Sequence, residues 1–328
     1  MSKKKLVECF ISICFVFLIL PINGTADQIE LNLFKTKTKK NNQVTYQQAY
    51  RYRGGIEFGL RLMGGGTYLL QNDINDYIQG INDFLSDIPD YEPDLSVDPN
   101  LTPANTGIDL SGELFINFNP HVGIGFGAGY ILVEKESSGG LSDSTRNFEN
   151  ITVYPKFSAI PLTFSLYFGG SLGGLSRIML NGGVGYYLGT INFDIIEEAG
   201  DPTASMKSTQ SWSTKSNEIG FHGGINFEFG FSRNFAFVIG TQGRYVQFTD
   251  LTGDLEEKLR LSNGFSSSDT KEDQTLWFGN KEMFTTHKEY PWVIFSENKP
   301  TAPWFSDVRK AEISLNGITL QGGIKLTF

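Results

Sequence analysis

Apolar residues recur at every second position in eight separate runs of the chain, with polar residues or glycines between them. In the first run, Ile56, Phe58 and Leu60 share one face, and Glu57 and Arg61 share the other. An alternation with period 2 indicates a β-strand with one apolar and one polar face. The eight runs read GIEFGLRLMGG, GIDLSGELFINF, HVGIGFGAGYILV, SAIPLTFSLYF, IMLNGGVGYYLG, EIGFHGGINFEFGF, FAFVIGTQGRYVQF and SLNGITLQGGIKLTF.

The connections between these runs differ in length in a regular way. Three are short, at NFNPHVG, GGSLGG and GFSRNFA, and they alternate with long segments at 71–106, 136–150, 197–216 and 249–310. A soluble sandwich would scatter its loop lengths, whereas short turns on one rim and long loops on the other are typical of an outer-membrane barrel. A sheet in lipid must also close, because an open edge finds no water. We therefore expect an all-β, eight-stranded antiparallel up-and-down transmembrane β-barrel with long extracellular loops and short periplasmic turns.

The first residues have the pattern of an export signal. Lys3 to Lys5 precede an apolar run at Leu6–Ile22, and the small residues Gly24, Thr25 and Ala26 follow it. A retained membrane anchor is the alternative, but the run is short for a span and contains Glu8 and Pro21. The domains expected are a cleaved signal peptide at 1–26, an N-terminal periplasmic linker at 27–53 with a short strand at Ile29–Phe34, and the barrel at 54–328.

Composition agrees with this class and excludes others. Thirty-seven glycines and 13% aromatic residues, with only 19% charged residues, are typical of a strand-rich chain with many tight turns. Both cysteines, Cys9 and Cys14, lie in the leader, so the exported chain has no disulfide or thiol chemistry. The leader also carries three lysines and one glutamate, so its removal changes the net charge from −9 to −9 − 2 = −11. An exported acidic protein is not expected to bind nucleic acid.

The C-terminal residues carry a resemblance to a known class. Gln321, Gly323, Leu326 and the terminal Phe328 match the assembly signal of bacterial outer-membrane proteins: polar, any, glycine, any, any, hydrophobic, any, aromatic. With eight predicted strands, residues 54–328 resemble small, porin-like barrels of the OmpA transmembrane-domain and OmpW kind. The resemblance implies the outer membrane of a Gram-negative-type bacterium, contact with outer-membrane lipid and lipopolysaccharide, and recognition by the barrel-assembly machinery. OmpA itself continues into a peptidoglycan-binding domain whereas this chain ends with its predicted barrel, so tethering is not implied.

The face opposite the apolar stripes carries ionisable residues. An eight-stranded barrel is just wide enough to be filled by side chains, so we expect a charge network in its lumen, joined by Phe115, Tyr167 and Tyr187. The inward glycines Gly123, Gly125, Gly127 and Gly129 would make room for them. The alternation places the ionisable residues on one face, so Glu57 could pair with Arg61, or Glu113 with Arg244. The alternative is a narrow gated channel in which the glycine row leaves a gap, although strand glycines also serve bending. The network comprises Glu57, Arg61, Glu113, Glu228, Arg244 and Lys325.

The first long segment predicts a helix. In 71–106, Ile74, Tyr77, Ile78, Ile81 and Leu85 have helical spacing, which indicates a short amphipathic helix over the barrel mouth. The same segment holds eight carboxylates and no lysine or arginine. These form a solvated acidic face or hold divalent cations that bridge lipopolysaccharide phosphates, but they lack the spacing of a calcium loop.

The last long segment is rich in aromatic residues. Exposed aromatic side chains on a loop would suit a hydrophobic ligand, a carbohydrate or a partner protein. The alternative is that they pack against one another and order the loop. The candidate loop binding surface comprises Trp277, Phe278, Trp292, Trp304 and Phe305.

Catalysis has little support in the sequence. His121, His222 and His287 have no neighbouring serine and acid that resemble a triad, although triad partners need not be sequence neighbours. No cofactor or metal site is expected. The function predicted is a non-enzymatic integral outer-membrane barrel with a structural or surface-binding, adhesion-like role through its extracellular loops, and the sequence identifies no ligand. The alternative is a narrow channel for small or hydrophobic solutes.

Overall fold

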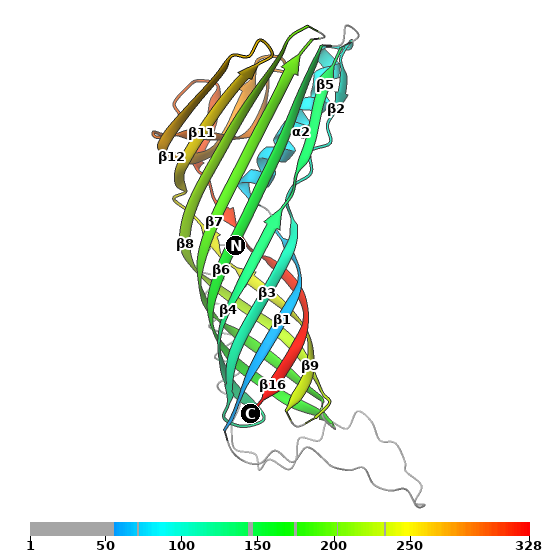
Figure 1. The fold of residues 1–328 in the computed structure, drawn as a ribbon, viewed down its shortest axis with the longest axis vertical. Helices are drawn as coiled ribbons and strands as arrows, with labels where there is room; N and C mark the ends of the chain where they lie inside the picture. Colours follow the sequence, from blue (N-terminus) through cyan, green and yellow to red (C-terminus); the bar gives the residue numbers. More distant parts are fainter. Residues whose placement is uncertain (1–55, 71, 144–146, 174–175, 202, 233) are drawn as a thin grey trace, which may run out of the picture. The chain divides into compact units, whose positions relative to one another are not determined.

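The described part of the chain is antiparallel β-sheet with one helix (Figure 1). The computed structural model describes residues 56–70, 72–143, 147–173, 176–201, 203–232 and 234–328, which belong to one compact unit within Gln48–Phe328. The predicted signal peptide, linker and short strand at Ile29–Phe34 lie outside these residues. Among the described residues, no helix combines the length and apolar composition required to cross a membrane.

Seventeen elements follow one another in the described residues, and all of their strands except β10 and β15 belong to one large sheet. Their bounds are β1 Glu57–Leu69, α2 Asp73–Tyr91, β2 Ser96–Asp98, β3 Thr106–Asn117, β4 Val122–Glu134, β5 Ser137–Ser142, β6 Phe148–Gly173, β7 Ser176–Gly200, β8 Ser205–Gly230, β9 Phe235–Tyr245, β10 Gln247–Phe248, β11 Thr252–Leu261, β12 Ser266–Met283, β13 Lys288–Ser296, β14 Phe305–Lys310, β15 Ile313–Ser314 and β16 Gly317–Thr327.

Eight strands pair in a cycle, which we call the ring. Strand β1 pairs with β3 on one side and with β16 on the other. The pairings then run from β3 through β4, β6, β7, β8 and β9 to β16, all antiparallel. Each of the eight predicted period-2 runs lies largely in one of these strands, so their prediction as strands is confirmed; the seventh run also reaches β10, and the eighth begins in β15.

The two faces of the ring strands have opposite chemistry. Apolar side chains of the predicted stripes are exposed, as for Leu114 at 63% and Ile219 at 69%. Charged residues between them are buried, as for Arg61 at 4% and Glu228 at 3%. Soluble proteins bury apolar side chains and expose charged ones, so this arrangement is inverted.

Three ring strands continue well past the others. Strands β6, β7 and β8 contain 26, 25 and 26 residues, whereas β9 and β16 contain 11 each. Their far halves pair with β5 on one side and with β11 on the other, and β12, β13 and β14 follow β11. We call these far halves, with β2, β5 and β11 to β14, the extension; Figure 1 shows these strands and α2 at one end of the ring strands.

The extension corrects the prediction of long loops. Segments 136–150, 197–216 and 249–310 are largely strand. In β8, for example, the stretch SMKSTQSWSTKS has one buried apolar residue, Trp212, among polar ones. A strand solvated on most of both faces lacks an apolar alternation, so a period-2 search does not detect it.

Helix α2 confirms the helix predicted in the first long segment. It begins after Asn72, whose side chain accepts a hydrogen bond from the Asn75 amide at 3.0 Å and so caps the helix. The predicted apolar face is buried in a core that joins α2, the extension and the adjacent ends of ring strands, including Leu69 of β1 and Tyr187 of β7. The buried residues of the helix face are Ile74, Tyr77, Ile78, Ile81, Leu85 and Ile88.

Candidate functional site

A chain of four alternating charges lies inside the ring. Arg61 of β1 donates to Glu113 Oε1 and to Glu228 Oε1, each at 2.9 Å, and Lys325 Nζ donates to Glu228 Oε2 at 2.7 Å. Glu113 and Lys325 are the register neighbours of Arg61 on β3 and β16, whereas Glu228 comes from β8. Two cations and two anions balance one another, and buried charges require such partners.

A second cluster lies around Arg244. Its guanidinium donates to Asp109 Oδ2 at 2.7 Å, to Thr67 Oγ1 at 3.1 Å and to the Leu315 carbonyl at 3.0 Å. Asp109 was not among the predicted network residues, although it has the same strand parity as Glu113 in the GIDLSGELFINF run. The alternation along this run was therefore sufficient to place Asp109 on the same face as Glu113.

The ion pairs differ from those that parity allowed. Arg61 pairs with Glu113 rather than with Glu57, and Arg244 pairs with Asp109. The Glu57 carboxylate lies 3.8 Å from the Arg177 guanidinium. Five of the six predicted network residues thus belong to the two clusters, and the sixth, Glu57, has Arg177 as its cationic neighbour.

Aromatic rings and glycines complete the interior of the ring. The Tyr167 hydroxyl donates to Glu113 at 2.6 Å, the Arg61 guanidinium lies 4.6 Å from the Tyr167 ring centroid, and the Lys325 ammonium lies 4.6 Å from that of Phe115. A Cβ at Gly125 would lie 2.5 Å from the Glu113 carboxyl carbon. The expectation that inward glycines make room for large inward side chains is confirmed at this position, and cation–π contacts stabilise the packing.

A serine and a histidine meet beside a small internal cavity. Ser165 Oγ lies 2.9 Å from His222 Nε2, and both side chains are buried. The cavity next to them measures about 60 Å³, far below the roughly 300–1,000 Å³ of small-molecule sites. Among the described residues, no hydrogen-bond partner is found for His222 Nδ1, where a triad would place a carboxylate. Ser165 and His222 are far apart in the sequence, so the sequence did not indicate that they meet. Among the described residues this pair has no acidic partner, and the cavity beside it is too small for a substrate.

Candidate metal ligands do not assemble in the described residues: no group of three histidine, cysteine, aspartate or glutamate side chains could hold an ion. Two of the predicted acidic residues of α2 have cationic partners instead. They are Asp73 and Asp87, near opposite ends of the helix.

These two carboxylates attach α2 to the rest of the extension. Asp73 accepts two hydrogen bonds from Arg309, at 2.6 and 2.7 Å, which raise the pKa of the guanidinium. Asp87 accepts from the Tyr290 hydroxyl at 2.7 Å and lies 3.0 Å from Lys288 Nζ. The Tyr290 hydrogen bond, and next the Lys288 one, lower the pKa of Asp87 below its ordinary value of 3.8.

Acid is expected to loosen the Asp87 end of α2. The pKa of Asp87 is lower in the folded state than in the unfolded state. Its contacts therefore stabilise the fold at pH values above the ordinary pKa, and this stabilisation is lost as the pH falls through the lowered folded-state pKa. The hydrogen-exchange protection factors of amides in the last turns of α2 should therefore fall below about pH 4. Asp87→Asn should remove this dependence, whereas Asp90→Asn on the exposed side should keep it. An unchanged profile in Asp87→Asn would contradict the assignment.

Three of the predicted surface aromatics are packed within the extension. Trp292 of β13 meets the Tyr77 ring edge to face at 5.1 Å, and Phe278 of β12 lies 4.8 Å below the Arg309 guanidinium. Trp277 donates its indole N–H to the Ser296 carbonyl at 3.0 Å. All three are half-buried, so at these positions aromatic packing orders the segment.

The other two predicted aromatics belong to an exposed group, which we call the aromatic patch. Trp304 and Phe305 lie 6.4 Å apart between ring centroids, and Phe284 lies 6.3 Å from Trp304. Phe284 is 77% exposed and Trp304 is 42% exposed. Phe284 was not among the predicted residues; it follows β12 directly and reaches Trp304 because β12 pairs with β14.

The predicted assembly-signal residues lie on the β1–β16 seam. Gln321 is buried on the inner face, Leu326 is opposite Leu60, and the exposed Phe328 donates its amide to the Phe58 carbonyl at 2.9 Å. A Cβ at Gly323 would lie 1.9 Å from the Leu62 carbonyl oxygen, so only glycine fits there without a backbone shift.

No protein-family model matches the chain, and no curated protein shows significant similarity to it. The resemblance to barrels of the OmpA and OmpW kind therefore stays a prediction from the strand pattern and the C-terminal residues.

Proposed function

We propose that this chain is an integral outer-membrane protein in which the ring is an eight-stranded transmembrane β-barrel. The observation that carries the proposal is the inversion of the ring's two faces, with apolar side chains exposed outward and charged side chains buried inward. Such an exterior is unfavourable in water and favourable against lipid tails. The cyclic pairing supports it further, since it leaves no sheet edge unpaired in the apolar band.

The height of the apolar exterior agrees with a bilayer. On β7 the exposed apolar stripe runs from Leu180 to Leu188, which is nine residues, and on β6 exposed apolar side chains of one face run from Ile160 to Leu172, which is thirteen residues. A tilted transmembrane strand needs about 9–11 residues. Beyond Ile160 the same face of β6 continues with Ser158 and Lys156, which are polar. We infer that the extension lies outside the bilayer, on the extracellular side as in other barrels with short periplasmic turns.

A packed, non-conducting lumen fits the interior better than a channel. The two charge clusters and the aromatic rings line a cavity of about 60 Å³, and an apolar core joins α2 to the adjacent ends of the ring strands. The alternative function, a narrow channel for small or hydrophobic solutes, would require these side chains to move. The role that remains is structural or surface-binding.

The aromatic patch is the best-supported binding surface of the extension. Large, rigid aromatic side chains supply much of the binding energy at interfaces, and Phe284 and Trp304 are exposed rather than packed. Vesicles carrying the protein can be screened against arrays of glycans and proteins. A hit that Phe284→Ser with Trp304→Ser removes, and that Phe265→Ser at another exposed position keeps, would support the adhesion-like role. Binding that the double substitution does not reduce would show that the adhesion-like role does not depend on the aromatic patch.

Insertion and conductance test the proposal as a whole. Purified protein folded with lipid vesicles should protect the ring strands from protease, and planar bilayers containing it should show no discrete openings. A variant with residues 73–91 replaced by a short glycine-serine linker should also be silent, because the ring interior itself is filled. Failure to insert would refute the membrane assignment. Openings in the intact protein would favour the channel, and openings only in the variant would make α2 its plug.

A further inference from the structure

The first half of β12 has one side that pairs with no strand of the described residues. Residues 266–274 pair with β11 on one side, whereas β13 joins the other side of β12 only from Thr275 onward. The side chains of residues 266–273 are all exposed. We call this unpaired side of residues 266–274 the open edge. A row of backbone amide and carbonyl groups on such an edge is a template for pairing with another strand.

The backbone groups of Thr270 point away from β11 and toward the open edge. In an antiparallel pair, residues that exchange backbone hydrogen bonds alternate with residues that do not. The Leu261 amide donates to the Phe265 carbonyl at 2.9 Å. Counted along the register from this bond, Asp269 and Lys271 bond with β11 and Thr270 does not. A strand that pairs with the open edge would therefore bond with Thr270.

The charges on either side of Thr270 complement a second copy of the same strand. Asp269 and Lys271 are two residues apart, so they share one face of β12. If two β12 strands pair antiparallel with Thr270 at the centre, Asp269 of each copy lies opposite Lys271 of the other, twice by symmetry. A pairing centred on Asp269 or on Lys271 would instead place identical charges opposite each other, which is destabilising. The sign pattern thus favours one register.

Asp269 lies in an unfavourable electrostatic environment within its own chain. Its register partner on β11 is Glu257, and carboxylates opposite one another on neighbouring strands repel. Lys271 pairs with Glu257, and the ion pairs found in the described part of the chain do not include Asp269. A lysine from a second copy would supply the cation that Asp269 lacks.

We propose that two copies of this chain in facing membranes pair through their open edges, an inference that rests on the proposed membrane location. Strand β12 runs along the ring strands, because it pairs through β11 with the far half of β8, as Figure 1 shows. Ring strands lean about 35–45° from the membrane normal. Copies in one membrane cross it in the same direction, so rotation about the normal cannot make their β12 strands antiparallel. Copies in facing membranes are inverted, and their open edges can pair.

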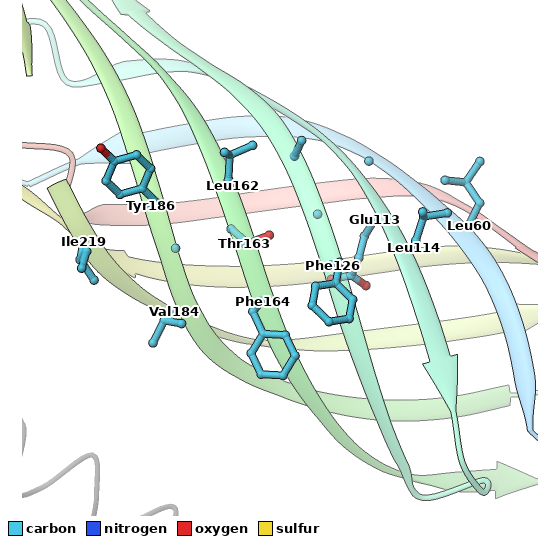
Figure 2. A pocket seen from close by; sticks show the side chains of 14 residues that line it. Leu60, Glu113, Leu114, Phe126, Leu162, Thr163, Phe164, Val184, Tyr186 and Ile219 are labelled. Atoms are coloured by element: carbon cyan, nitrogen blue, oxygen red, sulfur yellow. The ribbon is translucent and has the colours of Figure 1, made fainter. Parts of the chain in front are cut away.

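The extension is long enough for this arrangement. Thr270 is in register, through β11, with Ser211 of β8. Strand β8 begins at Ser205, six residues to one side of Ser211, and its outward apolar stripe begins at Ile219, eight residues to the other side. Figure 2 shows Ile219 near Tyr186 among the large apolar side chains of the ring exterior. The strands of a second copy would therefore end two residues short of the apolar exterior.

Clustering of vesicles that contain the full chain tests this, with donor dye in one vesicle population and acceptor dye in the other. The unsubstituted chain should bring the two populations together. Asp269→Lys and Lys271→Asp should each disperse them, and each should weaken the dimer about thirtyfold in native mass spectra in detergent, because two like-charge pairs replace two opposite ones. Vesicles with Asp269→Lys mixed with vesicles with Lys271→Asp should cluster again, since their open edges are complementary to one another.

Two further sets of variants distinguish the open edge from charge in general. Asp90→Lys and Lys215→Asp change exposed charges outside the open edge, and dimer affinity should stay within about twofold of that of the unsubstituted chain. Thr270→Pro removes the outward amide and should abolish the dimer, whereas the single chain should still fold because proline is tolerated where an edge amide faces solvent. Thr270→Ala keeps this amide and should keep the dimer.

The outcomes separate this inference from the function on which it rests. Clustering that the single charge variants do not reduce, or mixed variants that stay dispersed, would overturn pairing through the open edge. Dimers in detergent without clustering of vesicles into which the chain has inserted would overturn the facing-membrane arrangement. Insertion with any of these results would leave the membrane proposal intact. A chain that does not insert would refute the membrane location, and the native mass spectra of the mixed variants would still decide whether the open edges pair.

Discussion

Replacing Glu228 by glutamine should lower the free energy of unfolding by about 3–5 kcal/mol, the range for breaking a buried ion pair by removing one partner. Glu228 is 3% exposed and bonds with both Arg61 and Lys325. The amide would leave Lys325 buried without a carboxylate, while Arg61 would keep Glu113. Urea unfolding of the protein folded in vesicles, followed by tryptophan fluorescence, measures the change.

Two further variants show whether burial causes this effect. Glu198→Gln breaks an exposed pair with Lys207, whose side chain is 47% exposed, and should cost less than about 1 kcal/mol. Adding Lys325→Met to Glu228→Gln should recover much of the loss, because no unpaired buried cation then remains. Equal effects of Glu228→Gln and Glu198→Gln would show that water reaches the interior cluster and would favour the channel.

Replacing Gly323 by alanine should destabilise the β1–β16 seam by about 1–3 kcal/mol, the usual range for overpacking. The added Cβ would lie 1.9 Å from the Leu62 carbonyl oxygen and 2.7 Å from the Met63 sulfur, and the backbone oxygen cannot move away without breaking the strand register. The seam joins the first and last ring strands, so the folded yield in vesicles should fall as well.

The neighbouring glycine supplies the matched control for this prediction. Gly322 lies on the opposite face, where a Cβ would meet nothing closer than the Val238 carbonyl oxygen at 3.8 Å. Gly322→Ala should therefore change stability by less than about 0.5 kcal/mol. A similar loss in both variants would mean that glycine is required for strand flexibility rather than for close approach.

A polar interior explains how such a protein tolerates an apolar exterior. In the proposed membrane location, lipid would provide no hydrogen bonds, so the ring strands would satisfy their backbone groups by pairing, and the charged side chains would find their partners inside. A network with balanced charges needs no counter-ion, in agreement with a cavity as small as about 60 Å³. Under the proposed function, the apolar exterior contacts lipid and the extension lies outside the membrane.

The sequence by itself determined the eight ring strands, their two faces and helix α2. Period-2 alternation is a local signal, so Leu114 could be assigned to the apolar face and Glu113 to the inner one without any knowledge of their neighbours. The spacing of Ile74, Ile78 and Ile81 identified the helix for the same reason.

Only the tertiary structure decided which charges pair and what the long segments become. Parity places Arg61 and Glu228 on the inner face, but their contact crosses from β1 to β8, and only the pairing of all the strands brings them together. Strands β11 and β12 carry polar residues on both faces, and they form because the far half of β8 offers an edge to pair with. Such contacts join residues far apart in the chain, and no local pattern encodes them.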